Sequence, residues 1–157
     1  MKNFQQKEVE SSATPQVANA PLVTKYMTKK LITFKPETAI MDVVDTLLKN
    51  KITGAPVLDD QKNVVGLIDD KDCLKVLFGG AYHNQPVENN DVAHYMSNVM
   101  RTVSVHADIY EAAFIFLNSV YKRLLVVDDG GKLVGQISRR DILRAIHDFD
   151  TEAKWKK

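Results

Sequence analysis

The sequence predicts an α/β (α+β) protein built from two copies of one βαββα unit. Three observations support this fold class: the chain matches itself when shifted by 69 positions, each copy has a helical apolar period, and each copy has two short apolar runs around a polar turn. A chain of 157 residues is long enough for two small repeats that share a core.

The internal match runs without gaps through most of both copies. It contains 14 identical pairs over about 56 aligned positions, where ordinary composition gives roughly three or four by chance. A match of this length indicates a duplication, which predicts the same fold twice. The identical pairs include Tyr26 with Tyr95, Gly66 with Gly135, and Asp72 with Asp141.

Each copy predicts the same elements in the same order. The first helix has apolar residues at i, i+3, i+4, i+7 and i+8, starting from Ile40 or Ile109. The short apolar runs 55–58 with 64–68, and 124–127 with 133–137, surround polar turns and predict β-hairpins. A second helix follows each hairpin. One unit cannot cover its own sheet, so we expect the two units to pack together.

Composition shifts suggest the boundaries of the units. We expect a flexible tail at 1–19, the first repeat at 20–78, a linker rich in Gly, Asn and Pro at 79–91, the second repeat at 92–150, and a tail at 151–157.

Charge and apolar content argue against several partners. The 21 Lys and Arg residues balance 20 Asp and Glu residues, so charge gives no reason to expect nucleic acid or an anionic membrane. No apolar run approaches the roughly 18 residues that span a bilayer, and the first residues lack the apolar core of a signal peptide. The single cysteine, Cys73, cannot form an internal disulfide. We therefore expect a cytoplasmic protein without membrane insertion.

Three short pieces recur in order in both copies. They are Val-Thr-Lys-Tyr-Met-Thr with Val-Ala-His-Tyr-Met-Ser, Gly-Ala-Pro-Val-Leu-Asp with Arg-Leu-Leu-Val-Val-Asp, and Gly66–Asp72 with Gly135–Asp141. Together they resemble a tandem pair of CBS domains, a Bateman module, over roughly Pro21 to Phe149. The resemblance implies two three-stranded sheets packed face to face around a pseudo-twofold axis, with helices outside and homodimers as the usual assembly. It also implies an adenine ligand between the repeats, such as AMP, ADP, ATP, cyclic di-AMP or S-adenosylmethionine.

Ser138 and Asp141 are the sharpest local feature. Their spacing is that of a capping box that starts the last helix. The same helix start also suits a phosphate, because its N–H groups are unpaired and its dipole is positive. The Asp141 carboxylate could accept ribose hydroxyls in charge-assisted bonds worth about 1.5–3 kcal/mol each. The resemblance implies this role and completes the cleft with residues of the opposite copy. The main predicted ligand site contains Thr24, Ile52, Thr53, Gly54, Ala55, Pro56, Ile137, Ser138 and Asp141.

The equivalent run in the first copy departs from this pattern. Asp69 stands where Ser138 stands in the second copy, and its charge would repel a phosphate. Ala93 also lacks the hydroxyl that Thr24 offers. A cation site is an alternative for these neighbouring acids, but a capping run is favoured because no complete set of oxygen ligands is visible. The second, weaker predicted site contains Tyr121, Ile68, Asp69 and Asp72.

Basic residues of the second copy are candidates for phosphate binding. Lys122 and Arg123 resemble a basic pair in the gamma subunit of AMP-activated protein kinase, and Arg139 and Arg140 could complete a cationic patch. A solvated basic face is the alternative interpretation.

The remaining residues do not predict an enzyme, a catalytic cofactor or a metal site. The four histidines share no metal-ligand spacing, and Ser138 lacks the flanking glycines of a nucleophile elbow. We expect a non-catalytic regulatory module that binds an adenine nucleotide and signals to an effector protein in trans. The alternative is a ligand-free scaffold for protein–protein interaction or dimerisation.

Overall fold

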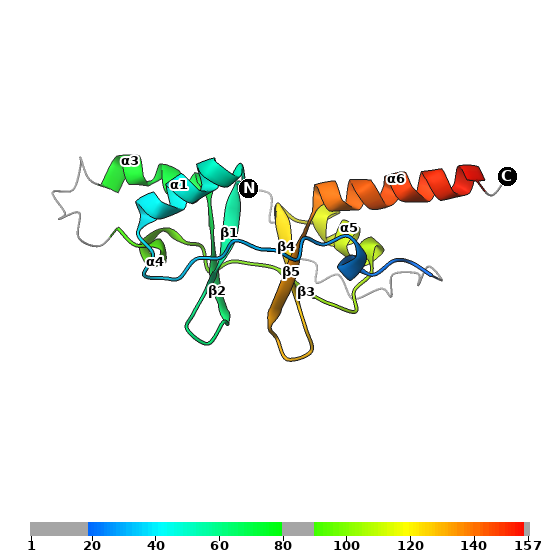
Figure 1. Ribbon diagram of the computed structural model, residues 1–157, viewed down its shortest axis with the longest axis horizontal. Helices are drawn as coiled ribbons and strands as arrows, with labels where there is room; N and C mark the ends of the chain where they lie inside the picture. The colour runs from blue at the N-terminus through cyan, green and yellow to red at the C-terminus, as the bar shows by residue number, and fades with distance from the viewer. Residues whose placement is uncertain (1–18, 80–89, 156–157) are drawn as a thin grey trace, which may run out of the picture.

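The computed structural model describes residues 19–79 and 90–155, and it places two α/β halves side by side (Figure 1). The first half contains α1 (Ile40–Asn50), β1 (Gly54–Leu58), β2 (Val64–Asp69), α2 (Asp70–Leu74) and α3 (Val76–Gly79). The second contains β3 (Thr102–Ser104), α5 (Ile109–Leu117), β4 (Arg123–Val127), β5 (Leu133–Ser138) and α6 (Arg139–Trp155). Two short helices, η1 (Val23–Lys25) and α4 (Val92–Tyr95), precede the halves.

The elements confirm the predicted duplication. The helices α1 and α2 and the strands β1 and β2 each begin 69 residues before α5, α6, β4 and β5, respectively. The sheets lie in the middle of the molecule and the helices outside them (Figure 1). The helix α6 continues to Trp155, into the segment expected as a tail, while most of the predicted linker lies outside the described residues.

The two sheets differ in their third strand. In the second half β3 runs parallel to β4, which pairs antiparallel with β5. In the first half β1 pairs with β2, and the expected third strand is reduced to one parallel bridge between Phe34 and Val57. The cause is Pro56, which has no N–H to donate to that strand. At the equivalent position, the N–H of Leu125 donates to the Arg101 carbonyl at 3.0 Å.

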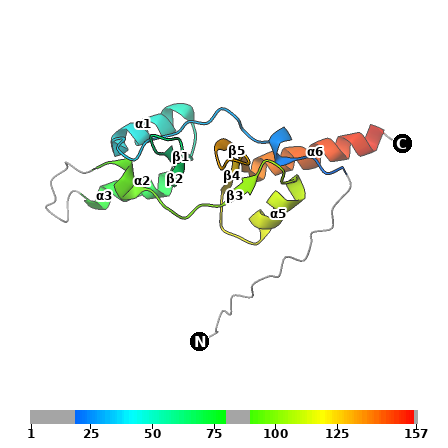
Figure 2. The same cartoon turned by 90° about the horizontal axis from the view of Figure 1, so that it is seen from below.

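Each half is completed by the segment that precedes the other half. We call residues 20–28 and 90–97 the lead-in segments. Val23 and Tyr26 are buried in the core of the second half, whereas Val92 is buried in the core of the first. Figure 2 shows the first lead-in segment beside α6. This exchange carries Thr24 into the same half as Asp141.

The helices bury only part of their predicted apolar faces. Ile40, Val43 and Leu47 of α1 are buried, but Leu48 is 73% exposed. Its equivalent on α5, Leu117, is 85% exposed. Large apolar side chains on α2, α3 and α6, the helices that follow the two hairpins, are also exposed.

Gln136 on β5 supplies a stability prediction. Its side-chain oxygen is buried without a hydrogen-bond partner among the residues that the structure describes, and leaving such a group unpaired costs about 1–3 kcal/mol. Leucine occupies the equivalent position, Leu67, in β2. We expect Gln136→Leu to raise the free energy of unfolding in urea by about 1 kcal/mol. The matched change Leu67→Gln should lower it, and a loss of stability in Gln136→Leu would contradict this account.

Candidate functional site

Ser138 and Asp141 form the predicted capping box at the start of α6. The Asp141 Oδ2 accepts hydrogen bonds from the Ser138 backbone N–H at 2.8 Å and from the Ser138 hydroxyl at 3.1 Å. The Asp141 N–H donates in turn to Ser138 Oγ at 3.3 Å. Asp141 is only 7% exposed, and it is the one buried polar residue of the described chain. The cap therefore holds a carboxylate in a fixed, largely desolvated position.

Arg144 fixes the other oxygen of this carboxylate. Its Nη2 donates to Asp141 Oδ1 at 2.7 Å and to the carbonyl of Tyr26 at 2.9 Å, which ties the lead-in segment to α6. A carboxylate offers about four acceptor positions, and three of them are used here. One acceptor position is not used by these hydrogen bonds, and a second would become available only if the Ser138 hydroxyl turned away.

Arg123 joins the two halves. Its Nη2 donates to Thr53 Oγ1 at 2.9 Å, across the junction from β4 to the residue before β1. Gly54 makes this crossing possible, because a Cβ there would lie 2.8 Å from Arg123 Nη1. Burial lowers the pKa of Arg123, and the charges of Asp69 and Asp70 oppose that shift. Arg123 therefore points to Thr53, and this bond uses one of the five N–H donors of its guanidinium group.

The start of α2 carries an all-acid version of the cap. Asp69 Oδ1 accepts from the Asp72 N–H at 2.9 Å, and Asp72 Oδ2 accepts from the Asp69 N–H at 3.1 Å. Lys75 lies 3.6 Å from Asp72, where the second half has the shorter Arg144 contact. Capping accounts for both of these carboxylates, as the sequence favoured.

The pKa of Asp72 is raised above 3.8, chiefly by burial, while the backbone hydrogen bond from Asp69 opposes the rise and the Asp69 charge adds to it. The folded state then holds this proton more tightly than the unfolded chain. Its contribution to stability is complete below about pH 3.8 and is lost as pH rises through the higher folded pKa.

The neutral variant Asp72→Asn should therefore gain stability relative to the unmodified protein as pH rises through the window above 3.8. Urea unfolding at a series of pH values measures the difference between the two curves. Asp45→Asn, at an exposed position on α1, is the control for a general charge effect. Parallel curves for Asp72→Asn and the unmodified protein would contradict the assignment.

The other predicted site residues fall into four groups. Thr53, Gly54, Asp69 and Arg123 meet at the junction, and Ser138 pairs with Arg123 across the β4–β5 ladder. Ala55, Pro56, Ile68 and Ile137 are buried in the strands, so a ligand there would meet backbone.

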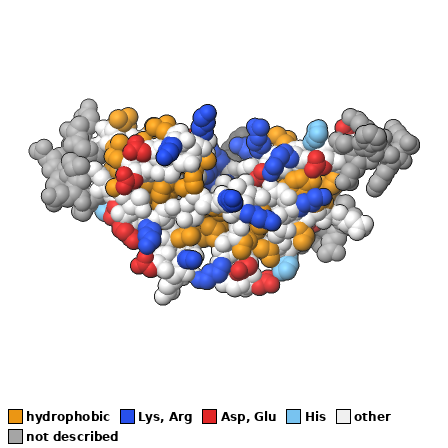
Figure 3. Space-filling view, in the orientation of Figure 1, with side chains coloured by type: hydrophobic (Ala, Val, Ile, Leu, Met, Phe, Trp, Pro, Cys, Tyr) orange, Lys and Arg blue, Asp and Glu red, His pale blue; other side chains and the backbone are white. Residues whose placement is uncertain are grey.

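Ile52 and Tyr121 pack against the cores of their own halves. Lys122, Arg139 and Arg140 are exposed, and Figure 3 shows Lys and Arg side chains over the middle of the molecule, where the halves meet.

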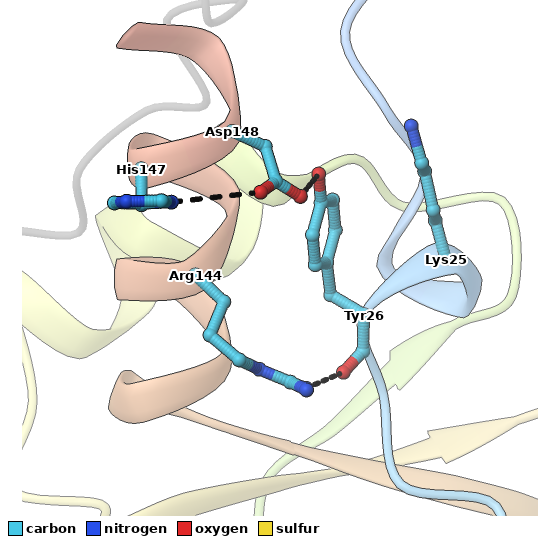
Figure 4. A pocket seen from close by; sticks show the side chains of 5 residues that line it. All are labelled: Lys25, Tyr26, Arg144, His147 and Asp148. Atoms are coloured by element: carbon cyan, nitrogen blue, oxygen red, sulfur yellow. Dashed lines mark hydrogen bonds and ion pairs between the residues drawn. The ribbon is translucent and has the colours of Figure 1, made fainter. Parts of the chain in front are cut away.

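A cavity that the sequence did not predict lies on the outside of the second half (Figure 4). It has a volume of about 490 Å³ and is lined by Lys25, Tyr26, Arg144, His147 and Asp148. The Tyr26 hydroxyl donates to Asp148 Oδ2 at 2.8 Å. The i, i+3, i+4 spacing of Arg144, His147 and Asp148 was the available sequence signal. The exchange of the lead-in segment, which supplies Tyr26, is not visible in a local pattern.

Within 19–79 and 90–155, no three His, Cys, Asp or Glu side chains are grouped so that they could hold a metal ion. No helix in these ranges combines the length and apolar character needed to cross a membrane.

Known proteins match this architecture. The profile of the CBS domain matches residues 23–79 and 92–148. The chloroplastic CBS domain-containing protein CBSX1 of Arabidopsis thaliana is 32% identical over 148 residues, which cover 78% of this chain and 63% of CBSX1. This chain therefore spans less than two thirds of that relative.

Solved structures agree with the fold. CBSX2 of Arabidopsis thaliana in complex with AMP is 30% identical with a TM-score of 0.73, covering 83% of this chain and 98% of that one. The CBS domain pair of protein MJ0100, in complex with 5-methylthioadenosine and S-adenosyl-L-methionine, is 25% identical with a TM-score of 0.67, covering 82% and 98%. The chain belongs to the CBS-domain family and carries a tandem pair of these domains.

Proposed function

We propose that this chain is a non-catalytic regulatory module that binds an adenine nucleotide in the cleft between its repeats and signals to a partner protein in trans. AMP, ADP, ATP and cyclic di-AMP are the candidate ligands. The observation that carries the proposal is the buried Asp141 carboxylate at the start of α6, in the repeat that Arg123 joins to Thr53 of the other.

The ligand chemistry follows from the groups at this junction. Asp141 would accept a ribose hydroxyl, and the first N–H groups of α6 with the Ser138 hydroxyl would bind a phosphate. Arg139 and Arg140 are exposed beside that helix start and would supply countercharge. The small residues Gly54 and Ala55 would let adenine approach the backbone of β1.

The relatives support the adenosine part of this proposal most strongly. AMP, 5-methylthioadenosine and S-adenosyl-L-methionine, the molecules bound by CBSX2 and MJ0100, share adenine and ribose but not phosphate. A ribose contact from Asp141 therefore serves every one of these ligands, whereas the basic residues would select among them.

The two clefts should differ in affinity. Ser138 at the start of α6 is neutral, whereas Asp69 at the start of α2 places a carboxylate where a phosphate would lie. We assign the main ligand to the Asp141 side and a weaker one to the Asp72 side, with Ile68, Asp69 and Tyr121.

The proposal includes a cytoplasmic homodimer that acts on an effector protein. Apolar side chains exposed on the helices favour self-association, and the balanced charge gives no reason to invoke nucleic acid or a membrane.

A ligand-free scaffold is the second candidate. It is favoured by Arg123, whose side chain crosses the junction and lies over Gly54, where it occupies space between the halves. In this case the Arg123–Thr53 bond would serve to lock the two repeats together.

Thermal unfolding with a ligand panel separates the two functions. An adenine ligand at 100 times its dissociation constant should add about 2.7 kcal/mol of stability, which raises the melting temperature by several degrees. GMP and inorganic phosphate are the controls for base recognition and for simple anion binding. If no adenine compound at millimolar concentration raises the melting temperature, the scaffold is the better account.

A further inference from the structure

An apolar groove lies on the outer face of the first half. It has a volume of about 450 Å³ and is lined by α1, α2 and α3. Its lining includes Met41, Leu48, Leu74 and Leu77, and the last two are 61% and 73% exposed. Asp70 is the one charged residue in this lining. We call this surface the repeat 1 face.

The second half presents a matching surface 69 residues later. Tyr110, Leu117, Leu143 and Ile146 occupy the positions equivalent to the four apolar residues above, and all of them are exposed. The equivalent of Asp70 is Arg139, so the charge at this position is reversed. Phe114, which is also exposed, replaces the acidic Asp45 of α1. We call this surface the repeat 2 face.

Both faces lie on helices along one edge of the molecule. Figure 1 shows α1, α3 and α6 along the edge opposite the two hairpin turns. A partner with the same pair of faces can therefore cover both at once. A second copy of this chain has that arrangement, and a twofold axis closes the assembly.

We propose that two copies pair head to tail, with the repeat 1 face of each copy against the repeat 2 face of the other. This inference rests on the homodimer in the proposed function and specifies its orientation. Head-to-head pairing would set Asp70 and Asp45 against the same acids of the second copy, and Arg139 against Arg139. Head-to-tail pairing sets Asp70 toward the opposite charge of Arg139 and gives the aromatic side chains of the repeat 2 face an aliphatic groove. Like charges brought together in an interface disfavour the first arrangement.

A complementation experiment on the full chain separates the two orientations. One variant carries Leu74→Asp and Leu77→Asp, which disable the repeat 1 face. The other carries Leu143→Asp and Ile146→Asp, which disable the repeat 2 face. All four side chains are exposed, so circular dichroism should show that both variants remain folded. Light scattering gives the mass of each variant alone and of the mixture.

In head-to-tail pairing, every interface between two copies of the same variant has one disabled face. Each variant alone is therefore monomeric. The mixture regains one intact contact and forms a heterodimer. In head-to-head pairing the result is reversed, because each variant alone keeps one intact contact and the mixed pair keeps none. Dimers of the separate variants would overturn the proposal.

A charge exchange provides an independent measurement. Asp70→Arg and Arg139→Asp should each weaken the dimer of the unmodified chain at least tenfold, and the double variant should restore it. If the mixture forms no heterodimer and the double variant does not restore the dimer, the proposed orientation is wrong. If the unmodified chain is monomeric, the homodimer itself is wrong. Nucleotide binding, tested by melting with the ligand panel, is unaffected by either failure.

Discussion

Asp141→Asn should weaken the binding of AMP by about 10- to 100-fold, which corresponds to the loss of one charge-assisted hydrogen bond of about 1.5–3 kcal/mol. Asparagine keeps the size of the side chain and one acceptor oxygen, but it loses the negative charge that strengthens the bond to a ribose hydroxyl. Isothermal titration calorimetry gives the affinity directly. The variant also weakens the α6 cap and the Arg144 pair, so binding is measured well below its melting temperature.

The matched change in the first copy, Asp72→Asn, should cause a smaller loss, because the main ligand is assigned to the Asp141 side. A 2′,3′-dideoxy form of AMP supplies a second control. It should bind the unmodified protein weakly, and Asp141→Asn should weaken it no further, because the hydroxyls that the carboxylate serves are absent. Equal losses for AMP and the dideoxy form would show that Asp141 acts through the fold and not through the ribose.

Gly135→Ala should destabilise the fold by about 2–3 kcal/mol. Gly135 lies on β5 beneath the first lead-in segment, and a Cβ there would lie 2.6 Å from Met27 Sδ and 2.8 Å from the Thr28 carbonyl oxygen. The segment cannot move freely, because Thr28 and Gln136 exchange two backbone hydrogen bonds of 2.8 and 3.0 Å. The added methyl group must therefore displace the segment or break this pairing.

Urea unfolding measures the loss of stability in Gly135→Ala. Gly130→Ala is the matched control, because its nearest contact would be Asp128 Oδ1 at 3.4 Å, and its effect should stay within about 0.5 kcal/mol. An unchanged free energy of unfolding in Gly135→Ala would contradict the exchanged packing of the lead-in segment.

The duplication and the order of elements could be predicted from the sequence, because hydrophobic periodicity and turn residues are local signals. The hairpin turns are a good example. Asp59 Oδ1 accepts from the N–H groups of Gln61 and Asn63, and Asp128 Oδ1 accepts from those of Gly130 and Lys132. The Asp residues of both predicted turns therefore act in the same way.

The incomplete third strand of the first half was the main error in the predicted fold. The sequence contains its cause, Pro56, but the effect depends on which side of β1 would need the missing N–H. That information comes only from the arrangement of the sheet. The exposed Leu48 and Leu117 could not be predicted either, because a helical period marks an apolar face without saying what covers it.

In the candidate site, too, the local contact could be predicted from the sequence and the long-range contacts could not. The Ser138–Asp141 cap is a contact over three residues, and its spacing predicts it. The bond from Arg123 to Thr53 joins residues 70 positions apart, and that from Arg144 to Tyr26 joins residues 118 apart. Long flexible side chains choose such partners by tertiary geometry, which is why the sequence could not predict that Arg123 donates to Thr53.

A nuclear magnetic resonance titration of the ¹⁵N-labelled chain with AMP tests the adenine site between the repeats most directly. We expect the largest amide shifts on Thr53, Gly54 and 138–141, at the junction of the two repeats. Shifts confined to the outer cavity around His147 and Asp148, or none at saturating AMP, would contradict an adenine site between the repeats.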